Sequence, residues 1–239
     1  MIERLADIHT HILPCVDDGA RNKETAIQML KAEAEEGTTL VVLTPHFISG
    51  RNRYKPDELQ LIYENLLRDP EISSLGIKLS LGNELYYTPD LAAELKAGRA
   101  RTLGNTNTVL VEFSTASSAK TIINGCRDIY NSGYSIILAH MERYPSIDSD
   151  SVLDALLGMD VSFQMNASYV KPLCMPVLNG TKRWHKRLLK DGIISYIASD
   201  AHDMNERRPS LSAKEIERAF PQYAADMLYG NAAKLLGIR

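Results

Sequence analysis

The sequence predicts an α/β fold whose parallel strands close into a distorted (β/α)7 barrel, with residues 1–239 forming a single domain. Apolar segments of strand length alternate seven times with longer segments of helical period, which favours a mainly parallel sheet. A polar side chain follows each strand candidate at or near its C-terminal end. An open, doubly wound sheet gathers functional groups at one switch point, whereas a closed ring brings all its strand ends together. The barrel is therefore the better prediction.

The seven strand candidates are short runs rich in Val, Ile, Leu and Thr. In order they read LADIH, TLVVLT, IKLSLG, TVLVEF, SIILA, VSFQM and ISYIAS. Runs of this length and composition are typical of buried strands in parallel sheets. They occupy residues 5–9, 39–44, 77–82, 108–113, 135–139, 161–165 and 194–199.

The helix candidates lie between these strands and carry apolar residues at helical spacing. They occupy residues 23–36, 56–68, 89–97, 119–132, 149–158 and 179–190. The C-terminal residues 210–236 also have a helical pattern. No low-complexity stretch, charge block or Ser/Gly-rich linker interrupts the alternation, so one domain is the simpler interpretation.

The composition is that of an ordinary globular protein. Of 239 residues, 44% are hydrophobic, and 27 basic side chains face 30 acidic ones, which gives a formal net charge of −3. A disordered chain has fewer apolar residues and a larger net charge, and a collagenous chain has far more than 14 Gly and 10 Pro. Both classes are excluded. Because the chain is slightly acidic, nucleic acid is not expected as a partner.

The sequence predicts a cytoplasmic protein that does not insert into membranes. Its longest apolar runs, residues 40–43 and 136–139, are far shorter than the roughly 20 residues that span a bilayer. The first residues, MIERLADIHTH, lack the apolar segment of a secretory signal. The three cysteines are odd in number and widely spaced, as expected of reduced thiols.

Histidines and carboxylates follow the strand candidates in a pattern typical of a metal centre. Imidazole nitrogen mixed with carboxylate oxygen suits Zn, Mn or Fe. Because side chains repeat every two residues on extended backbone, the HTH segment points both its rings to one side. Each histidine alone could be a satisfied core residue, but the joint pattern argues against that alternative. The candidate ligands are His9, His11, Asp18, His46, Glu84, Glu112, His140, Asp200 and His202.

Nine candidate ligands are too many for a single ion, so two or three metals are expected. Four of the candidates are carboxylates, and packing them together without neutralisation is strongly disfavoured. Three divalent cations would leave the cluster with a net charge of about +2, since +6 then faces −4. Such a site is matched to a phosphate dianion.

The segments HTH, DDG, TPH, GNE, VEF, AHMERY and SDAH resemble those of the PHP (polymerase and histidinol phosphatase) family. Within it they are most similar to the bacterial metal-dependent tyrosine-protein phosphatases encoded with capsular and exopolysaccharide assembly genes. The resemblance runs from His9 to Arg207, nearly the whole chain. It implies a distorted, TIM-like barrel of about seven strands with three divalent metal ions. Manganese is the expected metal, with iron and zinc as alternatives.

The resemblance also implies roles for individual residues. Arg143 and Arg207 match arginines that clamp the phosphate, although the adjacent Arg208 leaves the register of that loop open. Carboxylates at Asp18 and Glu112, where histidinol phosphatases usually carry histidine, favour the tyrosine phosphatase branch. His46 and His140 are expected to act in catalysis as well as in metal binding. The implied metal sets are His9, His11, Glu84 and Asp200; Glu84, Glu112 and His140; and Asp18, His46 and His202.

The function expected from this resemblance is hydrolysis of phosphomonoesters, with a phosphotyrosine protein as substrate. The implied substrate is the tail of a bacterial tyrosine kinase that regulates capsular or exopolysaccharide synthesis. One alternative is a small-molecule phosphatase acting on histidinol phosphate or a nucleotide. Another is a metal-stabilised protein that docks a kinase without catalysis. The oligomeric state stays open, a homo-oligomer included.

Two other enzyme classes fit the sequence less well. Cys15 and Arg21 have the Cys-x5-Arg spacing of cysteine-dependent phosphatases. The two aspartates between them would repel the phosphate that such a loop cradles. Metal-dependent amidohydrolases also begin with His-x-His, but they usually bridge their metals with a carboxylated lysine where this chain has Glu112.

Overall fold

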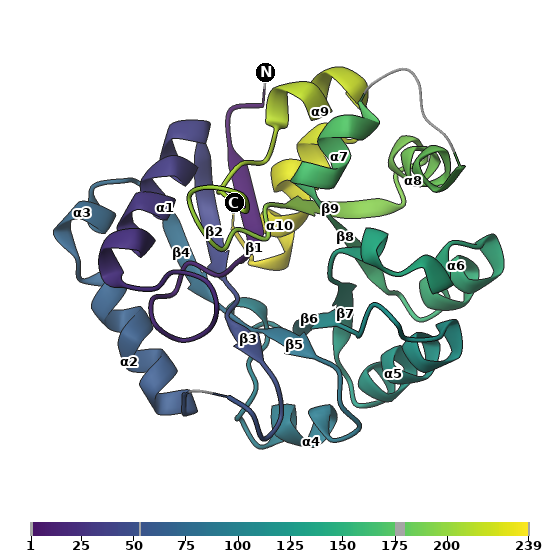
Figure 1. Ribbon diagram of the computed structural model, residues 1–239, viewed down its shortest axis with the longest axis horizontal. Coiled ribbons are helices and arrows are strands. Elements are labelled where there is room, and N and C mark those ends of the chain that lie inside the picture. The colour runs from purple at the N-terminus through teal and green to yellow at the C-terminus, as the bar shows by residue number, and fades with distance from the viewer. Residues whose placement is uncertain (1, 53, 175–179, 239) are drawn as a thin grey trace.

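The computed structural model describes residues 2–52, 54–174 and 180–238 (Figure 1). Within these ranges, the strands form two sheets in which all pairs are parallel. The first sheet has the order β1 (Leu5–Thr10), β2 (Thr38–Leu43) and β4 (Lys78–Leu81). The second has the order β3 (His46–Phe47), β5 (Glu84–Tyr86), β6 (Thr108–Glu112), β7 (Ser135–Leu138), β8 (Ser162–Asn166) and β9 (Ile194–Ala198).

All seven predicted strands form, but the second and third are each broken in two. The chain of β2 continues as β3 after Thr44 and Pro45, and Pro45 has no N–H with which to continue a ladder. The chain of β4 continues as β5 after Gly82, where a Cβ atom would lie 2.8 Å from the Leu103 side chain. These two chain segments therefore pass from one sheet to the other.

The two sheets also meet at the ends of β1 and β9. Thr10 and Ala201 form an isolated parallel bridge, and the Asp200 N–H donates to the His9 carbonyl oxygen at 2.9 Å. The His11 N–H donates to the Ala201 carbonyl oxygen at 2.8 Å. The prediction of one continuous ring is thus correct only in part, because the described strands form two parallel sheets linked at these points.

The helices lie where the helical periodicity predicts them, with two additions. α1 begins after Asn22, whose side chain accepts a hydrogen bond from the Thr25 N–H, and ends at Gly37 in the left-handed conformation. α3 and α7 are short, and the sequence pattern missed both. The helices are α1 (Lys23–Glu36), α2 (Pro56–Leu67), α3 (Pro70–Ser73), α4 (Leu91–Lys96), α5 (Ala119–Asn131), α6 (Asp150–Leu157), α7 (Ala167–Leu173), α8 (Gly180–Lys190), α9 (Ala213–Ala219) and α10 (Asn231–Leu235).

One of the helical predictions is correct only in part, and another begins outside the described residues. The C-terminal segment is not one helix, because α9 ends before Phe220 and a π-helical turn (Asp226–Gly230) precedes α10. The helix predicted over residues 179–190 is observed as α8, and its first residue lies outside the described residues. No helix of the described residues has the length and apolar character needed to cross a bilayer.

Three apolar clusters hold the layers together. One packs the first sheet against α1, α2 and α3, and a second packs the larger sheet against α4 to α9. The third lies between the two sheets and contains alternate strand residues, among them Ile8, Val42, Leu110 and Ile137. Because successive side chains point to opposite faces of a strand, each buried strand feeds both an inner and an outer cluster.

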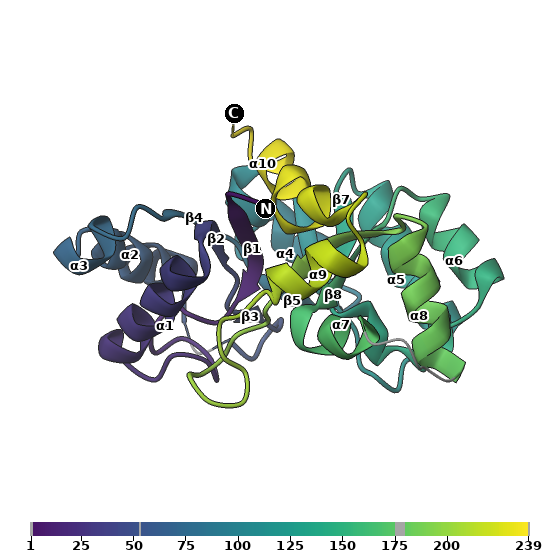
Figure 2. The ribbon, with the colours of Figure 1, turned by 90° about the horizontal axis from the view of Figure 1, so that it is seen from above.

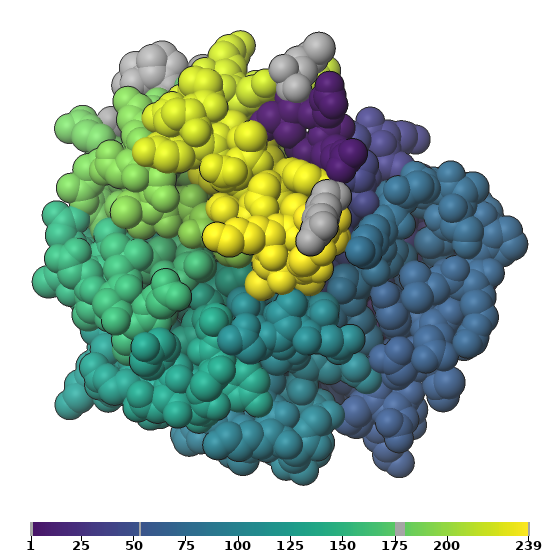
Figure 3. Space-filling model, turned by 180° about the vertical axis from the view of Figure 1, so that it is seen from behind, coloured from purple at the N-terminus to yellow at the C-terminus, as the bar shows by residue number. Residues whose placement is uncertain are grey.

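The molecule has two different ends. Figure 2 shows the loops after β1 and β9 on one side and α10 on the other. Figure 3 shows the α10 side, where the C-terminal residues lie beside the start of the chain. Ala232 of α10 belongs to the inner apolar cluster and closes it at that end. The C-terminal ends of the strands, with the loops that follow them, remain available at the other end for a functional site.

A buried pair of carboxyl groups lies behind the first strand. Asp7 accepts backbone hydrogen bonds from Ser199 at 3.1 Å and from His9 at 3.2 Å, so it joins β1 to the end of β9. Glu33 of α1 is also buried, and neither of its carboxyl oxygens has a hydrogen-bond partner among the described residues. Burial, together with the nearby Asp7 charge, raises the pKa of Glu33 well above its usual range. Glu33 therefore carries the proton of this pair.

Glu33→Gln keeps the size and polarity of the side chain but removes the titrating proton. Because the folded-state pKa of Glu33 lies above the unfolded value, its stabilisation is complete below the unfolded pKa and is lost as pH rises through the folded pKa. The stability of the variant relative to wild type should therefore increase with pH. Each pKa unit of separation corresponds to about 1.4 kcal/mol. Urea unfolding at acidic and alkaline pH measures the difference.

Glu35→Gln is the matched control, because Glu35 is an exposed carboxylate on the same helix. Its stability relative to wild type should change much less with pH. A Glu33→Gln protein whose relative stability is equally insensitive to pH would contradict the assignment of the proton.

Candidate metal centre

Histidines and carboxylates from six strand ends meet at one place. His9 lies on β1, His46 and Glu84 begin β3 and β5, and Glu112 ends β6. His140 lies two residues after the end of β7. Asp200 and His202 follow β9, and Asp18 lies in the loop between β1 and α1. Most of these side chains are buried, whereas the Asp18 side chain is 64% exposed. The sequence prediction that these residues converge is supported by their positions.

Glu84 lies at the middle of the cluster and is 1% exposed. Its Oε1 atom lies 2.8 Å from His140 Nε2 and 3.2 Å from His9 Nε2. Its Oε2 atom lies 2.9 Å from His46 Nδ1 and 3.3 Å from His11 Nε2. One carboxylate thus faces four imidazoles from three different segments of the chain.

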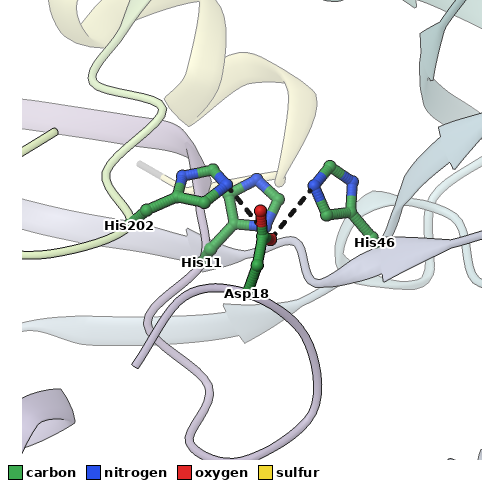
Figure 4. A group of neighbouring side chains, drawn as sticks. All are labelled: His11, Asp18, His46 and His202. Carbon is green, nitrogen blue, oxygen red and sulfur yellow. Dashed lines mark ion pairs between the residues drawn. The ribbon is translucent and has the colours of Figure 1, made fainter. Parts of the chain in front are cut away.

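A second group forms around the exposed Asp18 carboxylate. Its Oδ1 atom lies 3.4 Å from both His46 Nε2 and His202 Nε2, as the dashed lines of Figure 4 show. The ring of His11 lies beside that of His202, with 3.8 Å between the ring centroids. Asp18 therefore closes the open side of a group of three imidazoles.

Three sets of donor atoms are close enough to hold cations. In each set the nitrogen and oxygen atoms all lie within 4.8 Å of one another. Glu112 reaches this region as well, with its Oε2 atom 3.4 Å from His140 Nε2. The sets are His9, His11 and Glu84; His46, Glu84 and Glu112; and His11, Asp18, His46 and His202.

Asp200 connects the cluster to two arginines. Its Oδ1 atom lies 3.5 Å from His9 Nε2 and accepts a hydrogen bond from Arg207 Nη2 at 2.7 Å. Its Oδ2 atom accepts a hydrogen bond from Arg143 Nη2 at 2.6 Å. Arg207 rather than Arg208 turns toward the cluster. Together Arg143, Asn166, Asp200 and Arg207 line one end of a cavity of about 490 Å³.

Two members of the site have unusual backbone conformations. His140 has φ 32° and Asp200 has φ 55°, both in the left-handed region that non-glycine residues seldom adopt. Each residue lies two positions after the end of a strand, so the turn redirects a side chain that would otherwise continue the alternation of the sheet. Such strain persists only where surrounding contacts hold it, and it concentrates at functional sites. Here Gln164 Oε1 accepts a 2.7 Å hydrogen bond from the His140 N–H.

Hydrogen bonds to the outer ring nitrogens set the tautomers of three histidines. His9 Nδ1 lies 3.1 Å from Gln164 Oε1, His11 Nδ1 lies 2.8 Å from Asp17 Oδ2, and His202 Nδ1 lies 3.0 Å from the Asp200 carbonyl oxygen. These partners only accept, so each Nδ1 carries the proton and each Nε2 turns a lone pair inward. Metal-ligating histidines are held in this way. The buried His202 Nε2 has no hydrogen-bond partner among the described residues. The donor set therefore fits divalent cations.

Sequence reasoning did not assign the two side chains that hold these rings. Asp17 was noted as a neighbour of Asp18, but only the fold places it against His11 and against the His46 N–H, at 3.0 Å. Gln164 is a fully buried polar residue inside strand β8. The sequence offered one signal for Gln164, which is a polar side chain within an otherwise apolar strand. It gave no indication of the two histidine partners, because they lie at least 24 residues away along the chain.

The carboxylates change the proton affinity of the imidazoles. Although burial opposes the charged form, Asp17 and Glu84 raise the pKa of His11 to about 9. Burial opposes charge at His46 too, but Asp18 and Glu84 raise its pKa to about 11. His202 and His46 hold the pKa of Asp18 well below its usual range. Cations and protons therefore compete for the same nitrogen atoms, and metal binding releases protons.

The comparisons with known proteins identify the family. The profile described as "Capsular polysaccharide synthesis, CpsB/CapC" matches residues 5–237. The chain belongs to the CpsB/CapC family. This confirms the family resemblance that the strand-end motifs carry. The match covers every residue of the cluster.

Relatives of known sequence in this family have consistent names. Tyrosine-protein phosphatase CpsB of Streptococcus agalactiae serotype III (strain NEM316) is 30% identical over 97% of this chain and 98% of the relative. Tyrosine-protein phosphatase YwqE of Bacillus subtilis (strain 168) is 26% identical over 97% of this chain and 91% of the relative. The similarity therefore extends over nearly the full length of both chains.

Solved structures support the fold. One reported for YwqE from Bacillus subtilis and CpsB from Streptococcus pneumoniae, described as metal-dependent tyrosine phosphatases, has a TM-score of 0.85 at 25% identity. The match covers 98% of this chain and 94% of that chain. An organophosphorus hydrolase mutant from Deinococcus radiodurans has a TM-score of 0.59 at 12% identity, over 98% and 92% of the two chains. At that identity the likeness concerns the fold alone.

Gln164→Leu should weaken metal binding, because His9 loses the acceptor that fixes its tautomer and the His140 N–H loses its partner. Removing such an outer partner typically costs about 10- to 100-fold in metal affinity. Titration calorimetry with Mn²⁺ alone, on metal-free protein, measures the change. The thermal midpoint of the metal-free variant serves to confirm that it folds.

Gln164→Glu is the matched control, since it keeps an oxygen that accepts from His9. It should bind Mn²⁺ more tightly than Gln164→Leu does. Equal affinities for wild type and Gln164→Leu would show that Gln164 does not position the ligands.

Proposed function

We propose that this protein is a metal-dependent protein-tyrosine phosphatase that hydrolyses phosphotyrosine monoesters. The observation that carries the proposal is the position of Arg143 and Arg207, whose guanidinium groups line a cavity beside a cluster of imidazoles and carboxylates. Arginine pairs suit the planar, bidentate recognition of phosphate. The family membership and the names of the relatives support the same activity.

In this proposal nine side chains hold three divalent cations. Manganese is the expected metal, and iron and zinc are the alternatives. The central Glu84 carboxylate, which faces four histidines, would contribute to two of the donor sets that could hold these ions. The proposed ligands are His9, His11, Asp18, His46, Glu84, Glu112, His140, Asp200 and His202.

The proposed chemistry divides between the ions and the side chains. Divalent cations supply Lewis acidity, which polarises a phosphoryl oxygen and makes water nucleophilic at neutral pH. Arg143 and Arg207 bind the equatorial oxygens and stabilise charge that spreads over them in a loose transition state. His46 and His140 orient the carboxylates that surround the reacting group. Because the pKa of a tyrosine hydroxyl is about 10, the leaving group needs less protonation than an alkoxide does.

The proposed substrate is a phosphotyrosine tail of a bacterial kinase that regulates capsular or exopolysaccharide synthesis. The family description places relatives in capsular polysaccharide synthesis. We further propose that residues 1–239 fold as one domain, with both sheets forming a distorted TIM-like barrel. The cysteines at positions 15, 126 and 174 are unpaired thiols, which favours a reducing compartment such as the cytoplasm. A homo-oligomer is compatible with the proposal.

Metal removal and substrate choice test the function. Protein treated with EDTA should lose hydrolysis of a phosphotyrosyl peptide, and added Mn²⁺ should restore it, because the ligands hold the ions only reversibly. The Mn²⁺-loaded protein should have a higher kcat/KM for that peptide than for histidinol phosphate. Phosphate release under matched conditions measures both.

Each alternative gives a different result in this assay. A clear preference for histidinol phosphate or a nucleotide would indicate a small-molecule phosphatase. Metal binding and kinase binding without phosphate release would indicate a docking protein. Activity that survives complete metal removal would contradict the metal-dependent mechanism.

Cys15→Ser should leave the activity within about twofold of wild type, as expected of a surface substitution away from the reacting groups. Cys15 is exposed, and its thiol lies 3.3 Å from the Arg21 carbonyl oxygen rather than in an anion-binding loop. Hydrolysis of the phosphotyrosyl peptide measures the effect. Complete loss of activity in this variant would instead favour a cysteine-dependent phosphatase.

A further inference from the structure

A groove leads away from the two arginines of the metal centre. The cavity of about 490 Å³ that holds Arg143 and Arg207 adjoins a second cavity of about 400 Å³. The residues that line the second cavity come from the end of α1, from α7, from the loop that follows β9 and from the start of α9. The residues that line both cavities are Glu36, Lys171, Arg208, Ser210 and Ser212.

The shape of this groove suits a chain rather than a small molecule. Small-molecule sites of about 300–1,000 Å³ usually enclose most of the ligand surface. This groove has a comparable volume, but it is only partly enclosed and is lined mainly by charged and hydroxyl side chains. A phosphoryl group between Arg143 and Arg207 would fill only its inner end. The rest is available to residues that flank a phosphotyrosine.

The middle of the groove carries two basic side chains, Arg208 and Lys171, and only Lys171 has a carboxylate partner among the described residues. Arg208 is exposed and has no carboxylate within 4.0 Å among the described residues. Lys171 is 59% exposed and has one acidic partner, Glu215, at 3.5 Å. The Ser210 hydroxyl donates a hydrogen bond to the nearby Glu36 carboxylate, 3.2 Å away. Arg208 and Lys171 are therefore available to an anionic group.

Hydrogen bonds hold the loop after β9 in a turn next to Arg208. The N–H groups of His202 and Asp203 donate to the Arg207 carbonyl oxygen at 2.8 and 3.2 Å. The Asp203 carboxylate in turn accepts from the Asn205 N–H at 2.6 Å. Within this turn, Arg207 reaches inward to Asp200, and the next residue, Arg208, lines the groove. Arg207 thus lines only the inner cavity, whereas the adjacent Arg208 lines both cavities.

We propose that this groove binds the polypeptide on one side of the phosphotyrosine, where Arg208 and Lys171 recognise an acidic side chain. This inference rests on the proposed phosphatase function and adds a preference among its substrates. The inner cavity supports it, since four basic side chains face three acidic ones there, and Asp200 is already paired with Arg143 and Arg207. Ion pairs at such exposed positions affect encounter and specificity more than they affect the chemical step.

Phosphotyrosyl peptides with Glu, Ala or Lys at successive flanking positions test the proposal on Mn²⁺-loaded protein. The wild type should have a kcat/KM about five- to tenfold higher for the best Glu peptide than for the Ala peptide, the size expected of two exposed ion pairs. Arg208→Ala combined with Lys171→Ala should remove this preference, mainly through KM. Arg208→Glu should favour the Lys peptide instead.

Two controls separate recognition from chemistry. Turnover of p-nitrophenyl phosphate, which has no flanking residues, should be unchanged in the Arg208 and Lys171 variants. Lys190→Ala removes an exposed lysine at the end of α8, away from the groove, and should leave every peptide unaffected.

The failures of the two proposals are distinguishable. Equal kcat/KM for the Glu, Ala and Lys peptides in the wild type would overturn the groove assignment and leave the phosphatase function in place. An equal loss on all substrates in the double variant would also overturn it. Hydrolysis of neither the peptides nor p-nitrophenyl phosphate would overturn the phosphatase function itself.

Discussion

The Glu84 carboxylate is the constraint on which the rest of the site depends. It is buried, and four imidazole nitrogens lie 2.8–3.3 Å from its two oxygen atoms. A buried carboxylate is costly unless opposite charge surrounds it. The end of β1, the start of β3 and the residues after β7 must therefore all lie within reach of the start of β5. The interruption of the third strand before Glu84 serves this purpose, because β5 then pairs with β3 and β6 while β4 stays beside β2. Charge compensation and the division of the sheet are thus two aspects of one arrangement.

Hydrogen bonds from residues around the histidines make this arrangement specific. Gln164 accepts from both His9 and His140, and its amide nitrogen donates to Asn166 at 2.8 Å. Asn166 in turn donates to Asp200 at 2.8 Å. This chain of contacts joins the metal-binding groups to the carboxylate that Arg143 holds. Rings that are already fixed in orientation and tautomer bind cations without the entropic cost of ordering them. A buried hydrogen-bond network has this effect when every polar group in it has a partner.

Much of the fold and site could be predicted, for an identifiable reason. In a parallel sheet, the C-terminal ends of all strands lie on one side, so the positions of Glu112, His140 and Asp200 after apolar runs were enough to place them together. The helical period likewise predicted α1 to its last residue. The pattern failed at α7 and at the C-terminal segment. Short helices and a π-helical turn depend on packing more than on periodicity.

By itself, the sequence determined the residue types at the strand ends, and therefore the chemistry of the site: imidazole and carboxylate ligands beside arginine. Only the tertiary structure decided which atoms face one another. The left-handed turns at His140 and Asp200, the outer contacts of Asp17 and Gln164, and the separation of Arg207 from Arg208 all depend on hydrogen bonds or packing between distant segments. Periodicity records the direction of a side chain relative to its own strand. It carries no information on the partner that reaches it from another strand.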